Sequence, residues 1–95
     1  MLQVADHDDT VTIHISGRFD YRLIKEFQQL LAKSPRMWVV DLSGVDYVDS
    51  SALGMLLLLR ERVQGEAQRV HLRGVHGQPR DVLAMAKFDR MFKVD

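Results

Sequence analysis

The chain contains no cysteine, has no net charge and has no long apolar run. Without cysteine there is no disulfide, no thiol nucleophile and no thiolate metal site. The 13 basic and 13 acidic residues balance, which argues against a nucleic-acid-binding surface. The longest apolar run, Met55 to Leu59, is far shorter than the about 20 residues that a membrane span requires. We therefore expect no direct contact with nucleic acid or with a membrane.

The amino terminus also lacks the features of a secretion signal. Residues 1–9 have neither a basic segment nor an apolar core, so no signal peptide is expected. A chain of 95 residues can form one domain with a two-layer core. We expect a single soluble, cytoplasmic domain over residues 1–95.

The first half of the chain predicts a hairpin, a helix and a central strand. Residues 2–5 and the alternating residues 10–16 predict two strands joined by a polar turn, with His14 on the solvated side. Asp20 is a suitable cap for a helix over residues 21–33. Residues 37–42 are almost entirely apolar, as in a central strand, and Ser43-Gly44 predicts a turn after it.

The second half is organised around an amphipathic helix. Its apolar residues recur at the i, i+3, i+4, i+7 and i+11 positions of one helical face: Ala52, Met55, Leu56, Leu59 and Val63. Asp49, Ser50 and Ser51 begin this helix, and we expect it to end near Gly65. A helix start has unpaired N–H groups and partial positive charge, so a phosphate on a serine there is well accommodated.

The remaining residues predict three short elements. Residues 68–73 read as a strand, and Pro79 suits the first turn of a last helix that runs to Lys87. Val82, Leu83, Met85 and Ala86 give this helix an apolar side. Residues 88–94 fit either a short helical turn or an edge strand.

Leu57 and Leu58 lie outside the apolar stripe of the central helix, on the same side as Ser50 and Gly54. Either another helix covers the two leucines, or they belong to an exposed apolar patch for a partner. Gly54 costs the helix about 1 kcal/mol. Close approach by another backbone is a benefit that can offset this cost.

No motif in the chain predicts catalysis. The four histidines, His7, His14, His71 and His76, do not have the spacing of metal ligands. Phosphate-binding glycine loops and the nucleophile-elbow motif are absent. We expect a protein that is not an enzyme and needs no metal or cofactor. From the residues alone, Asp20 and the Asp49-Ser50-Ser51 run are most simply helix caps.

Residues 39–54, Val-Val-Asp-Leu-Ser-Gly-Val-Asp-Tyr-Val-Asp-Ser-Ser-Ala-Leu-Gly, resemble the STAS domain of bacterial anti-sigma factor antagonists. The shared pattern is an apolar strand, Asp-x-Ser, then Asp-Ser-Ser-Gly-Leu-Gly and an apolar helix. Gly17-Arg-Phe-Asp20 is similar to the Gly-x-x-Asp segment of the family. The chain departs from the pattern at Ala52, where glycine is common.

The resemblance implies an α/β fold: a mixed β-sheet of four to five strands with helices mainly on one face. It also implies partner switching. In that family an anti-sigma factor with kinase activity phosphorylates a serine at this helix start, and only the unphosphorylated antagonist binds the anti-sigma factor and frees the sigma factor. The resemblance assigns the acceptor to Ser51. A partner surface then includes Asp20, Asp49, Ser50, Gly54, Leu57 and Leu58, and a phosphatase is a further expected partner.

Two alternatives stay open. STAS-like domains also occur in lipid-transport assemblies and in anion transporters, so the chain can be a constitutive subunit that is never phosphorylated. The transporter version requires a membrane segment, which this sequence lacks. The other alternative is a hydrolase that uses Ser50 or Ser51.

Overall fold

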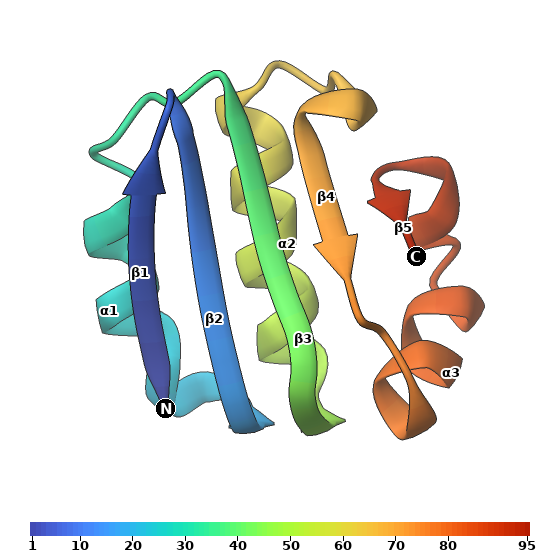
Figure 1. Ribbon diagram of the computed structural model, residues 1–95. Helices are drawn as coiled ribbons and strands as arrows, with labels where there is room; N and C mark the ends of the chain where they lie inside the picture. The colour runs from blue at the N-terminus through green and yellow to red at the C-terminus, as the bar shows by residue number, and fades with distance from the viewer.

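The computed structural model describes all 95 residues as one sheet with three helices. The sheet has the strand order β1-β2-β3-β4-β5 (Figure 1). β1 is antiparallel to β2, and every other neighbouring pair is parallel, so the predicted mixed α/β sheet is confirmed. The strands are β1 (Leu2–His7), β2 (Thr10–Phe19), β3 (Met37–Val48), β4 (Val70–Arg73) and β5 (Lys93–Val94).

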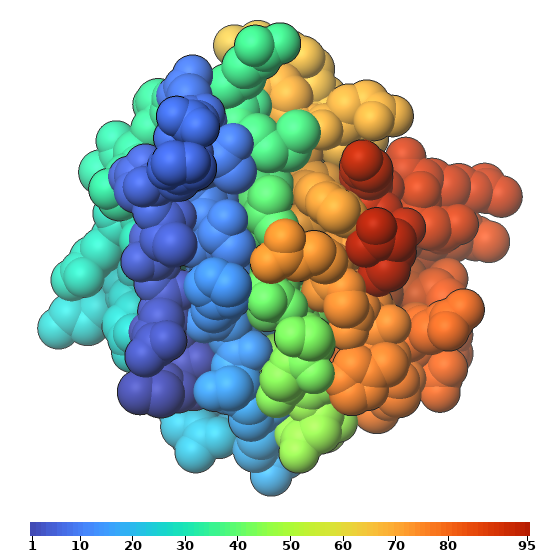
Figure 2. Space-filling view, viewed as in Figure 1, coloured from blue at the N-terminus to red at the C-terminus, as the bar shows by residue number.

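The helices lie mainly on one face of the sheet, as predicted. α1 (Ile24–Leu30) and α2 (Ser50–Arg62) run side by side behind the strands, and α3 (Gly77–Met85) lies at the β4 end (Figure 1). The other face is open, and residues of the first four strands reach its surface (Figure 2). None of the helices has both the length and the apolar character needed to cross a membrane.

The predicted hairpin forms between β1 and β2. Its turn residues Asp8 and Asp9 have φ values of 50° and 62°, as two-residue hairpin turns require. Val11, Ile13 and Ile15 are buried, whereas His14 is on the open face, as the alternation predicts. The amphipathic stripe of α2 is likewise confirmed, because Ala52, Met55, Leu56, Leu59 and Val63 are all buried in the core.

The turn predicted at Ser43-Gly44 is wrong, because β3 continues to Val48. The pairing with β2 shifts from His14↔Asp41 to Ser16↔Gly44, so β3 contains one extra residue at this point. Such a bulge bends a strand without ending it. The Asp41 carboxylate accepts bonds from the Ser43 backbone N–H at 3.0 Å and its hydroxyl at 2.7 Å. These turn-like local bonds form here inside a strand.

Other element boundaries differ from the prediction by a few residues. The helix expected over residues 21–33 is a 3₁₀ turn (Tyr21–Leu23) followed by α1. The first residue of α1, Ile24, is 36% exposed although it is apolar. α2 ends at Arg62, because Gln64 and Gly65 adopt the left-handed backbone conformation. Met85, predicted on the apolar side of α3, is 85% exposed. Residues 88–94 supply both a 3₁₀ turn (Phe88–Arg90) and β5.

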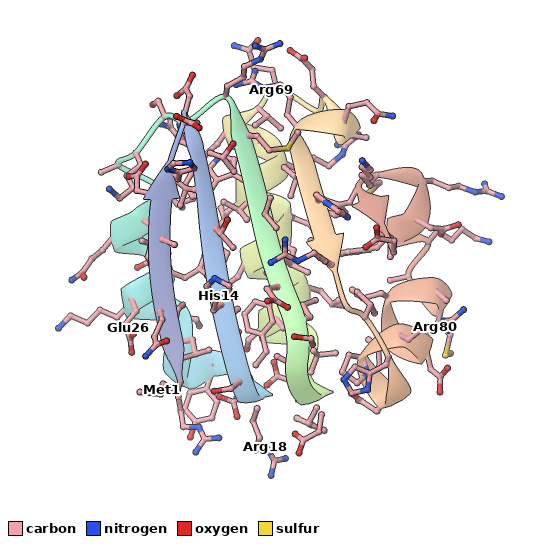
Figure 3. All side chains as sticks on the ribbon, viewed as in Figure 1. Met1, His14, Arg18, Glu26, Arg69 and Arg80 are labelled. Carbon is pink, nitrogen blue, oxygen red and sulfur yellow. The ribbon has the colours of Figure 1, made fainter.

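Asp41 connects three strands across the open face. Besides Ser43, its carboxylate accepts a bond from Arg73 on β4 at 3.3 Å and lies 3.1 Å from Nδ1 of His14 on β2, which is labelled in Figure 3. Partial burial opposes ionisation of this carboxyl, but the bonds from Ser43, Arg73 and His14 outweigh it. They lower the pKa of Asp41 from 3.8 to about 2.

We expect Asp41→Asn to destabilise the domain by about 1–2 kcal/mol at neutral pH, because bonds to a charged acceptor are lost. A depressed pKa in the folded state means that this contribution is complete above pH 4 and declines as the pH falls from about 4 to about 2. Urea unfolding at pH 7 and pH 3 measures the difference. An equal gap between wild type and variant at both pH values would contradict this role.

Candidate functional site

Two helix starts lie together at one edge of the sheet. Phe19 at the end of β2 pairs with Val48 at the end of β3, so Asp20 and Asp49 leave the sheet next to each other. Each carboxylate caps the turn that follows it, with 3.1 Å bonds from the backbone N–H groups of Arg22 and Ala52. We call residues 17–22 and 46–51 the capping edge.

The serine pair at the start of α2 is accessible. Ser50 is exposed and Ser51 is partly exposed, whereas the next residue, Ala52, is fully buried. The helix itself offers no carbonyl partner to the N–H groups of Ser50 and Ser51, and its dipole is positive here. Both serine residues are therefore at least partly accessible to solvent.

Asp20 is buried, with a relative exposure of 6%. Arg22 donates to it through Nε at 3.0 Å and Nη2 at 2.9 Å. These bonds outweigh the opposing effect of burial and lower the pKa of the carboxyl. Arg18 is the second cation beside it, with Nε 4.0 Å from the carboxylate. The surface over Asp20 is therefore formed by arginines, and the carboxylate itself does not face solvent.

The two leucines outside the apolar stripe of α2, Leu57 and Leu58, differ in how far they are exposed. Leu57 is 41% exposed, while Leu58 is only partly exposed. Gly54 is also exposed, and a Cβ built on it meets nothing within 4 Å. No helix of this chain covers Leu57, so an apolar side chain remains available near Gly54.

Gln78 was not singled out in the sequence, yet it fixes the end of β3. Its side chain accepts the backbone N–H of Val48 at 2.9 Å and donates to the Val48 carbonyl at 3.0 Å. A side-chain amide on α3 thus takes the place of a neighbouring strand just before Asp49. Gln78 and Val48 are 30 positions apart in the chain, so no local sequence pattern predicts this contact.

A second contact fixes the bulge of β3 to the segment before α3. Gly74 has a φ of +73°, and a Cβ on it would lie 2.8 Å from Cβ of Ser43. The ring Nε2 of His76 lies 2.9 Å from the Ser43 carbonyl oxygen. Only glycine permits both this backbone conformation and this close approach.

The fold agrees with comparison to known proteins. The family model described as "Mlab, STAS domain" matches residues 2–94. The chain therefore belongs to the STAS domain family. A STAS-domain containing protein of Pseudomonas aeruginosa (strain UCBPP-PA14) is 42% identical over 87 residues, which are 88% of this chain and 86% of that protein.

Solved structures with the same fold include two proteins described as anti-sigma factor antagonists and one described as a putative antagonist. SpoIIAA in its unphosphorylated form matches with a TM-score of 0.78 at 15% identity, covering 100% of this chain and 87% of SpoIIAA. A putative antagonist from Thermotoga maritima gives 0.84 at 19% identity over 98% and 84% of the two chains. The antagonist from Mycobacterium paratuberculosis gives 0.79 at 22% identity over 99% and 83%. At these identities the likeness establishes the STAS fold.

We expect Gly54→Ala to raise the stability of the domain by about 1 kcal/mol, because alanine favours helix and the site is open. Gly74→Ala is the matched control and should lower stability, since its Cβ would overlap Ser43. Thermal unfolding of both variants measures the contrast. A destabilised Gly54→Ala variant would mean that the helix is not open at this position.

Replacing Gln78 with alanine should cost about 1–3 kcal/mol, because it removes two hydrogen bonds from Val48. Amide hydrogen exchange at Val48 should accelerate. Gln28→Ala on the exposed side of α1 is the control, since Gln28 is exposed and lies on another helix, and it should leave Val48 unchanged. Slow exchange at Val48 in the Gln78 variant would show that other contacts hold the end of β3.

Proposed function

We propose that this domain is a cytoplasmic, non-enzymatic anti-sigma factor antagonist whose partner binding is ended by phosphorylation at the start of α2. The observation that carries this proposal is the Asp49-Ser50-Ser51 motif at the accessible end of a helix that also exposes Leu57. Membership of the STAS family and the shared fold with anti-sigma factor antagonists support it.

One helical face connects the serine pair to the apolar surface. Ser50, Gly54, Leu57 and Leu58 are spaced i, i+4, i+7 and i+8, so they follow each other along the same side of α2. A partner helix or strand that packs on Gly54 and Leu57 comes within reach of Ser50. A phosphate on the pair therefore lies at the margin of the surface that the partner covers.

The charge of one phosphate is sufficient to end such a complex. Phosphorylation adds about −1.5 to −2 charges, next to Asp49 and near the exposed Asp46. A partner carboxylate at about 6 Å is then repelled by about 1–5 kcal/mol for effective dielectrics between 80 and 20. Because each 1.4 kcal/mol is about a tenfold change in affinity, this repulsion weakens the complex enough for it to dissociate. The first buried residue of α2 is Ala52, so neither serine belongs to the core and the fold persists.

Ser50 and Ser51 each have support as the residue that accepts the phosphate, on different grounds. The family motif assigns Ser51, which is our proposed site. Ser50 is the more exposed hydroxyl, and a kinase active site has to enclose its acceptor, so accessibility supports Ser50. The two serines are therefore tested separately and together.

The test is phosphate transfer from the purified anti-sigma kinase to wild type, Ser50→Ala, Ser51→Ala and the double variant. We expect Ser51→Ala to abolish labelling and Ser50→Ala to retain it. The reverse pattern would assign the acceptor to Ser50 and leave the regulatory proposal intact. Wild-type labelling of the double variant would contradict the proposal, because the phosphate would then be located elsewhere in the chain.

A constitutive subunit of a larger assembly, such as a lipid-transport complex, is the second candidate. The exposed Leu57 favours it, since a permanent neighbour would cover this side chain without any phosphate. Co-purification with transport ATPase subunits, and no phosphate detected by intact mass, would support this candidate. The hydrolase hypothesis has less support: the ring of His14 pairs with Asp41 and that of His76 with the Ser43 carbonyl, and neither is hydrogen-bonded to Ser50 or Ser51.

A further inference from the structure

Two arginines emerge at the capping edge on either side of a buried carboxylate. Arg18 and Arg22 have side-chain exposures of 57% and 59%, whereas the side chain of Asp20 between them is 8% exposed. Arg18 projects beyond the ends of β2 and β3 (Figure 3). The Asp20 carboxylate lies beneath the two guanidinium groups, so the arginines, and not Asp20, are the charges that face solvent here.

Both guanidinium groups are held in place before any partner arrives. Arg22 engages Asp20 through Nε and Nη2, and its Nη1 forms no hydrogen bond. Arg18 stacks on the ring of Tyr47, with its guanidinium carbon 4.2 Å from the ring centroid. Arginines that are ordered in advance lose little conformational entropy when they bind, which favours their use in recognition.

The arginines border a surface hollow next to an exposed tyrosine. Gly17, Arg18, Asp20, Arg22, Leu23 and Glu26 are among the residues that line it. Tyr21 follows Asp20 and is 64% exposed. Exposed arginine and tyrosine side chains are the residue types that contribute most to binding at protein interfaces.

The charges around the hollow favour a single carboxylate over a polyanion. Asp20 and Glu26 belong to the hollow, and Asp46 and Asp49 lie along the same edge. A nucleic acid or an anionic membrane would bring its phosphates against these acids as well as against the arginines. One acidic side chain of a folded partner can reach the arginines and avoid the acids.

We propose that Arg18 and Arg22 bind an aspartate or glutamate side chain of the protein partner, with Tyr21 packing beside the contact. Asp20 then acts by positioning the arginines and does not touch the partner. This inference rests on the proposed function, because it assumes that the partner of α2 also covers the capping edge.

The experiment first captures the partner and then reverses charges. A photo-crosslinking amino acid at Leu57 in the source cells isolates the partner, and the purified partner is the probe. We expect Arg18→Glu to weaken binding by about tenfold or more, as for loss of a close interfacial charge pair. Arg18→Gln should give a smaller loss. Arg80→Glu on α3, away from this edge (Figure 3), is the matched control and should bind as wild type.

Recovery of affinity identifies the contact. Replacing the responsible partner carboxylate with lysine should restore binding to Arg18→Glu and weaken binding to wild type. Wild-type affinity of Arg18→Glu, while Leu57→Glu abolishes binding, would overturn the arginine site and leave the proposed function standing. If the crosslink at Leu57 captures no protein, the proposed function fails and the arginine site fails with it. A melting temperature for each variant confirms that it is folded.

Discussion

The parallel pairing of β2 with β3 places the two halves of the capping edge next to each other. The two strands end in register at Phe19 and Val48, so the chain leaves the sheet twice at one place. An aspartate follows each strand end, and each caps the turn that follows. The same pairing therefore brings together the arginine pair around Asp20 and the serine pair after Asp49, two segments that are about thirty residues apart in the chain.

Several contacts hold this strand end in one position. The bulge at Ser43 is closed by Asp41, and the segment before α3 packs on it through Gly74. Gln78 then takes both backbone bonds of Val48. With the backbone fixed up to Asp49, the proposed phosphate on the next residues would change the surface charge and leave the packing of α2 in place. A domain built in this way can be switched at its surface without unfolding.

Much of the fold follows from periodicity in the sequence. The alternation of residues 10–16 and the stripe from Ala52 to Val63 predict β2 and α2, because burial of one face determines which residues are apolar. The turn expected at Ser43-Gly44 fails for a local reason: the bonds from Ser43 to Asp41 are those of a turn, but pairing with β2 keeps the chain extended.

The site is less visible in the sequence than the fold. The motif predicts Asp49, Ser50 and Ser51 as site residues, and at the start of α2 Ser50 is exposed while Asp49 and Ser51 are partly exposed. Asp20 was expected on the partner surface, but two neighbouring arginines enclose it, and spacing alone does not show which way a carboxylate points. Gln78 depends on a contact across the fold and carries no local signal.

Under the proposed function, phosphate at the start of α2 removes the partner and leaves the domain folded. Calorimetric titration of the isolated partner into the unphosphorylated protein, and into the same protein carrying phosphoserine at the mapped acceptor, tests it most directly. We predict a loss of affinity of about tenfold or more for the phosphorylated form, with an unchanged melting temperature. Equal affinity of the two forms, or loss of binding only because the phosphorylated domain unfolds, would contradict the account.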